Sequence, residues 1–98
     1  MTPAEMLAAT PHWAGDVPDL TDWAVVGVLL GMLVAESPHL VDIGIVHVDP
    51  DGNYGGPNGA FVPLWEINHE VDGDVVGERE LTLGEALAKA LLYAWRHR

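Results

Sequence analysis

Carboxylates are the side chains in this sequence most able to do chemistry, and they are unevenly distributed. Thirteen aspartates and glutamates stand among residues 1–78, whereas lysine and arginine are absent from them. The formal net charge of −11 combines −13 for residues 1–78 with +2 for the rest. One sign of charge over most of a domain repels phosphate and attracts basic surfaces. We therefore expect a basic protein surface as partner, with no direct nucleic-acid binding and no membrane binding. All basic residues lie near the C-terminus: Arg79, Lys89, Arg96 and Arg98.

The acidity also has a simpler explanation. An acidic surface can serve solubility alone, as in the proteins of a salt-loving organism. The chain would then be a structural or assembly protein rather than one that seeks a basic partner. A solubility role explains an excess of acid, but it does not require basic residues to vanish from 78 consecutive positions.

Two strands around Gly73 concentrate the carboxylates that could meet a partner. Carboxylates two residues apart on one strand lie about 6.7 Å apart, on the order of the step between backbone phosphates of nucleic acid. Such an array could act as a DNA mimic in a groove built for nucleic acid, and an ordinary solvated sheet face is the alternative. The predicted partner-binding residues lie on this hairpin and at the other end of the sheet: Glu66, Glu70, Asp72, Asp74, Glu78, Glu80, Asp49 and Asp51.

The register of that hairpin decides which carboxylates share a face. Pairing Val71 with Val75 puts Glu66 opposite Glu80, although like charges directly opposite each other cost roughly a few tenths of a kcal/mol. The neighbouring register, with a two-residue Asp-Gly turn, would place an isoleucine opposite Glu78. We therefore predict the first register.

Patterns that would support catalysis or metal binding are weak. Counting an EF-hand loop from Asp49 puts Tyr54 and Ala60 where glycine and glutamate are needed, so a hairpin turn is the better interpretation. His47 and His69 could face each other across neighbouring strands, but a metal site or an enzyme would need a third ligand. The chain has no cysteine, no G-x-S-x-G motif and no phosphate-binding loop. We expect a non-enzymatic protein without cofactor or metal.

The elements that position these residues follow from capping and periodicity. Residues 2–5 (TPAE) and 82–85 (TLGE) are capping boxes that open a short first helix and an amphipathic last helix. A second helix begins near Asp19 or Thr21 and ends at about Glu36, where Ser37-Pro38 stops it. The order α-α-β-β-β-α in a single domain (1–98) predicts an α+β fold, with helices on one face of a three-stranded antiparallel sheet. The expected strands are residues 40–48, 61–71 and 75–81.

The second helix carries an unusually long apolar run. All twelve positions from Ala24 to Ala35 are apolar or glycine, whereas roughly twenty are needed to span a membrane. A helix that is apolar all round is normally covered on most sides. Gly27 and Gly31 form a G-x-x-x-G pair, which predicts either tight packing within the domain or self-association into a homodimer.

Two resemblances arise from this arrangement. The long helix, the DPDG turn and the closing TLGEALAKALLYAW segment resemble small phage "ABA sandwich" domains over about Leu20 to Trp95. That resemblance supplies no site residues, and the apolar second helix departs from the family. The order helix, three strands, helix is also similar to a double-stranded-RNA-binding domain. In that family the last helix begins with a cluster of lysines, whereas the first turn of the last helix here holds only Glu85, so we do not expect RNA binding.

Charge and the phage resemblance together lead to one functional expectation. We expect a small acidic inhibitor that blocks a basic, nucleic-acid-handling protein of a bacterial host, of the anti-restriction or anti-CRISPR type. The N-terminal segment lacks the basic start of a signal peptide, so we expect a cytoplasmic protein. The alternative is a structural or assembly protein that self-associates through Gly27 and Gly31.

Overall fold

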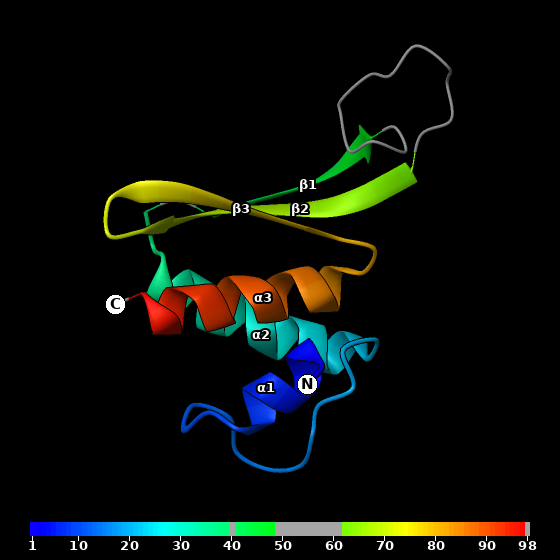
Figure 1. The fold of residues 1–98 in the computed structure, drawn as a ribbon, viewed down its shortest axis with the longest axis vertical. Helices are drawn as coiled ribbons and strands as arrows, with labels where there is room; N and C mark the ends of the chain where they lie inside the picture. The colour runs from blue at the N-terminus through cyan, green and yellow to red at the C-terminus, as the bar shows by residue number, and fades with distance from the viewer. Residues whose placement is uncertain (40, 49–61, 98) are drawn as a thin grey trace.

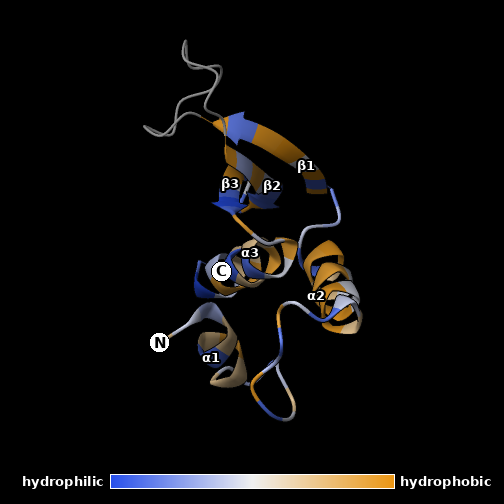
Figure 2. Ribbon diagram, turned by 90° about the vertical axis from the view of Figure 1, so that its right-hand side faces the viewer, coloured by the Kyte–Doolittle hydropathy of each residue, from blue (hydrophilic) through white to orange (hydrophobic). Residues whose placement is uncertain are grey.

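The computed structural model describes residues 1–39, 41–48 and 62–97, and confirms the α+β fold in the expected order (Figure 1). The strands form one antiparallel sheet in the order β1-β2-β3. Helices α2 and α3 lie side by side below one face of the sheet, and α1 packs on α3 away from it (Figure 2). The elements are α1 (Pro3–Ala8), α2 (Trp23–Glu36), β1 (Val41–Val48), β2 (Val62–Val71), β3 (Asp74–Glu80) and α3 (Leu83–Arg96).

The capping motifs begin the first and last helices as expected. The Thr2 hydroxyl accepts a hydrogen bond from the Glu5 backbone N–H, and the Glu5 carboxylate accepts one from the Thr2 N–H, each 3.2 Å long. At the start of α3, Thr82 Oγ1 accepts from the Glu85 N–H at 3.2 Å. These bonds satisfy backbone donors that no helical partner can reach.

Helix α2 begins slightly later than the sequence predicts. Its cap is Asp22, whose carboxylate accepts from the Ala24 N–H at 2.9 Å, and neither Asp19 nor Thr21 takes that place. Asp19 instead accepts from the N–H and the hydroxyl of Thr21, which stabilises the preceding turn. The helix ends at Glu36, as expected before a Ser-Pro pair.

Helix α3 supplies the centre of the core. Its residues Leu87 and Leu91 have no exposed surface, and they pack in one cluster with Leu7, Leu33 and Ile67 from α1, α2 and β2. The amphipathic last helix predicted from the sequence is therefore confirmed, with Leu83 at its start only half-buried.

A glycine lets α3 approach the chain before α2. A Cβ atom at Gly84 would lie only 1.9 Å from the backbone oxygen of Leu20, which no side chain can accommodate. From the sequence, Gly84 is expected only as part of the TLGE capping segment. The requirement for glycine at this position comes from the contact with Leu20.

The β2–β3 hairpin adopts the register that the sequence analysis rejected. Val71 pairs with Asp74, so Ile67 lies opposite Glu78. The turn consists of Asp72 and Gly73, with φ of 51° and 87°. Two positive φ angles are typical of the type I′ turn, whose twist matches that of the strands. This turn geometry outweighs the cost of placing a carboxylate opposite a buried isoleucine.

Helix α2 is covered on one side only, so the expectation of cover on most sides is wrong for the single chain. Leu29 and Leu33 are fully buried, while Val28 is 53% exposed. Cβ atoms added at Gly27 and Gly31 would meet no atom within 4 Å, so these glycines do not mediate tight packing inside the domain. Within the parts of the chain that the structure covers, every helix is too short or too polar to cross a membrane.

Candidate functional site

Two of the predicted binding carboxylates lie on the helix side of the sheet. Glu80 accepts a hydrogen bond from the Lys89 ammonium group of α3, and this bond raises the pKa of Lys89. Burial raises the pKa of Glu78, an effect that Lys89 partly offsets. Lys89 thus connects α3 to the sheet. Glu78 and Glu80 serve that contact and do not belong to an open acidic array.

Glu66 lies on the outer face of the sheet, where a basic side chain neutralises it. Its Oε2 atom accepts from Arg79 Nε at 2.7 Å, and its Oε1 atom accepts from Asn68 Nδ2 at 3.1 Å. Arg79 is the cross-strand partner of Glu66 in the observed register. The continuous array of opposed carboxylates predicted for this hairpin is therefore absent from the described strands. Asp49 and Asp51 lie outside the described residues.

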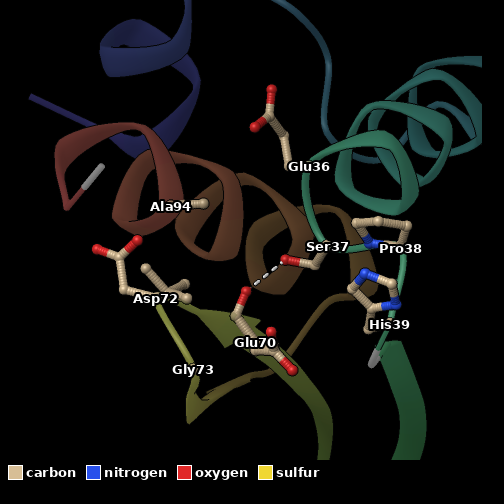
Figure 3. A pocket seen from close by; sticks show the side chains of 9 residues that line it. Glu36, Ser37, Pro38, His39, Glu70, Asp72, Gly73 and Ala94 are labelled. Atoms are coloured by element: carbon tan, nitrogen blue, oxygen red, sulfur yellow. Dashed lines mark hydrogen bonds between the residues drawn. The ribbon is translucent and has the colours of Figure 1, made fainter.

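The remaining predicted carboxylates gather at the turn end of the hairpin. Asp72 and Asp74 are exposed, and Glu70 is half-buried beside them. A pocket of about 350 Å³ opens there between the end of α2 and the hairpin (Figure 3). It is lined by Glu36, Ser37, Pro38, His39, Glu70, Val71, Asp72, Gly73 and Ala94.

A hydrogen bond fixes the two walls of this pocket relative to each other. Ser37 Oγ, just after α2, donates to the Glu70 backbone oxygen of β2 at 2.7 Å. Glu36 lines the recess from the end of α2, where its Oε1 atom accepts a hydrogen bond from Trp95 Nε1 at 3.2 Å. Asp72 and Glu70 line it from the hairpin, so acidic residues from two distant segments border one recess (Figure 3). Such a recess suits a cationic group, because an Arg or Lys head group forms charge-assisted hydrogen bonds with carboxylates.

Sequence reasoning identified the hairpin residues of this pocket and missed its other wall. Ser37 and Pro38 were interpreted only as a helix stop, and His39 received no role. The two walls are 33 residues apart along the chain at their hydrogen bond, and no local pattern indicates that they meet.

The histidine pair proposed as a metal alternative does not form. His69 lies opposite Val41 and His47 opposite Pro63, at different ends of the sheet. Within residues 1–39, 41–48 and 62–97, no three histidines or carboxylates are grouped so that they could hold a metal ion. His69 is fully buried with its ring 6.1 Å from that of Tyr93, and neither of its nitrogens has a hydrogen-bond partner. Burial lowers the pKa of His69, so it is a neutral core residue.

Comparisons with known proteins give no family assignment. No family model matches the chain, and neither a curated protein nor a solved structure does. The resemblance to phage ABA-sandwich domains stays a prediction.

Proposed function

We propose that this chain is a non-enzymatic binding protein whose acidic hairpin end docks on a basic surface of another protein. The observation that carries the proposal is the contrast between two groups of carboxylates. Glu66 and Glu80 are each neutralised by a basic side chain. Glu70, Asp72 and Asp74 make no ion pair with any described residue. Their negative charge is thus left unbalanced at the turn end of the hairpin, next to a recess.

The chemistry of this end favours a particular class of partner. Its carboxylates can receive an Arg side chain in the pocket and further basic side chains at the exposed turn. Proteins that handle nucleic acid carry such Arg and Lys clusters to contact phosphates. We therefore propose a nucleic-acid-handling protein as the partner, and inhibition by occupation of its basic surface. A phage-encoded inhibitor of host restriction or CRISPR nucleases is the specific case that the resemblance implies.

The observed register changes the form of this proposal. Mimicry of phosphate spacing along the strands requires Glu66, Glu78 and Glu80 to share a face, and they do not. The hairpin end replaces the strand face as the proposed contact.

A capture experiment with matched charge reversals tests the proposal. Wild type, Asp74→Lys and Asp16→Lys are immobilised and exposed to a bacterial lysate at low salt. Both substitutions change the net charge equally at exposed positions, but Asp16 lies in the connection between α1 and α2, at the end of the molecule away from the sheet (Figure 1). We expect wild type and Asp16→Lys to retain a nucleic-acid-binding protein that elutes with salt or added DNA, and Asp74→Lys to lose it.

Two results would contradict docking through the hairpin end. Equal retention by all three chains would show that the contact lies elsewhere. Retention of no salt-sensitive protein would leave acidity as a solubility device, in agreement with the structural alternative.

A further inference from the structure

One side of α2 is exposed along the whole helix and is apolar; we call it the outer face of α2. At 3.6 residues per turn its smallest residues fall in one line along the middle of this face. Val28 lies on one side of that line, while Trp23 and Val34 lie on the other; their exposures are 53%, 72% and 46%. The residues of the line, all exposed, are Ala24, Gly27, Gly31 and Ala35.

The outer face of α2 is uncharged in a chain that carries a formal charge of −11. No charged residue lies between Asp22 and Glu36, and Figure 2 shows hydrophobic colour on the side of α2 turned away from α3. A helix that is apolar all round is stable in water only when both sides are covered, and contiguous exposed apolar surface marks an interaction site. The face offers no charged side chain that could form an ion pair with a charged partner surface. An uncharged apolar helix is therefore complementary to it.

We propose that the outer face of α2 binds the same face of a second copy, with the two helices antiparallel. A two-fold axis midway between Gly27 and Gly31 would place each of these glycines against the other in the partner. The same axis keeps each edge of the face on its own side, so Trp23 lies against Val34 of the partner subunit and Ala24 against Ala35 of the partner subunit. The larger side chains therefore meet along one edge and the small ones along the middle line. Antiparallel helices also bring opposite dipole ends together. The face can therefore pair with itself along its whole length without bringing a charged residue into the contact.

The exposed area limits this contact to a weak dimer. With Trp23, Val28 and Val34 about half to three-quarters exposed, a pair of copies would bury at most on the order of 1,000 Å², the lower limit for a specific interface. Dimer formation does not depend on the docking proposed for the hairpin end, because it uses a different surface with no carboxylate on it. Either proposal can fail while the other stands.

Sedimentation equilibrium of three chains tests this dimer. We expect wild type to rise from 10.5 kDa toward twice that mass as its concentration increases up to about 1 mM. Gly27→Leu should remain at the monomer mass while keeping its circular dichroism spectrum, because the added side chain meets open space in one chain but blocks close approach of two. Gly44→Leu is the matched control, since it adds the same side chain in open space on β1 and should dimerise like wild type.

The absence of cysteine allows a second test by cross-linking. Gly27→Cys and Gly31→Cys chains, one of them carrying a mass tag, are mixed and oxidised. The antiparallel arrangement predicts that the mixed disulfide forms faster than either self-disulfide, because bridged Cα atoms must come within about 7 Å. Monomeric wild type at every concentration, dimerisation of Gly27→Leu, or self-disulfides of Gly27→Cys in excess would overturn the proposal.

Discussion

Helices α2 and α3 have the same length, 14 residues, and lie side by side, yet they are covered to different extents. In α3 the charged residues Glu85, Lys89 and Arg96 leave a continuous apolar stripe, which the chain buries from Ala86 to Ala94. In α2 there is no polar side, and the chain covers only about half of the helix. An amphipathic pattern thus specifies which side of a helix is buried within one chain. A helix that is apolar on all sides, such as α2, has more apolar surface than this chain buries.

The largest contrast should come from truncating one side chain in each helix. Leu91→Ala opens a cavity beneath α3 at a position without exposed surface, so it should lower the free energy of unfolding by about 2–5 kcal/mol. Val28→Ala removes methyl groups that are already in water and should change it by no more than about 0.5 kcal/mol. Urea unfolding at concentrations that keep the chain monomeric measures both. Similar losses for both variants would mean that α2 is covered within one chain.

Replacing a glycine by alanine should change the stability in opposite directions in the two helices. Gly84→Ala forces a Cβ atom against the Leu20 backbone and should destabilise the fold by roughly 1–3 kcal/mol or more. Gly27→Ala meets nothing in the single chain and should stabilise α2 by about 0.5–1 kcal/mol, because alanine loses less backbone entropy in a helix. Thermal and urea unfolding of the two variants would show the opposite signs. A lower free energy of unfolding for monomeric Gly27→Ala would show that another part of the chain packs against the outer face of α2.

The buried imidazole packed against α3 should make stability depend on pH. Burial lowers the pKa of His69 below its unfolded value of about 6.5. Its contribution is therefore fully present above pH 6.5 and is lost as the pH falls through the folded pKa, because the unfolded chain binds the proton first. Glu78, whose pKa burial raises, acts in the opposite direction, since its carboxyl takes up a proton in the folded chain first. The effect of His69 is isolated by comparing variants.

In that comparison, His69→Leu should remove the loss of stability between about pH 7 and pH 5. Its stability at pH 7 should be unchanged or higher, because an unpaired buried polar group is replaced by an apolar one. His47→Leu, which removes an exposed imidazole from β1, should keep the wild-type slope. Urea unfolding at several pH values provides the measurement. An unchanged slope in His69→Leu would show that the imidazole has a partner or is hydrated.

The smallest effect concerns the contact between α3 and the sheet. Glu80→Lys would bring two ammonium groups together at Lys89 and should destabilise the chain by no more than about 1 kcal/mol, because both positions are partly exposed. In the register expected from sequence, the same substitution would relieve repulsion with Glu66 and stabilise the chain. The sign of the change therefore reports which register the hairpin has in solution. Asp16→Lys provides the control for a change of net charge.

The features that sequence predicted well are those that depend on neighbouring residues. The capping box at Thr2, the cap at Thr82, the end of α2 before Pro38 and the strand segments all follow from short patterns. The hairpin register was mispredicted because the comparison weighed charge against burial at Ile67 and neglected the preference of Asp72-Gly73 for a two-residue turn.

Features that depend on segments far apart in the chain could not be predicted. The acidic pocket exists because Ser37 meets Glu70, and the need for glycine at position 84 exists because α3 approaches Leu20. The open side of α2 was missed for a related reason, since its sequence indicates a need for cover but not how much of it one chain supplies.

We propose two separate contact surfaces: the charged hairpin end binds a basic partner, and the uncharged outer face of α2 mediates self-association. The dissociation constant of the dimer, measured by sedimentation equilibrium at ionic strengths of about 0.01 M and 0.15 M, tests that division most directly. The Debye length falls from about 30 Å to about 8 Å between these conditions. Because both copies carry a formal charge of −11, screening should tighten a dimer formed through the uncharged face. A dimer that weakens with added salt would contradict the account, since its contact would then depend on opposite charges.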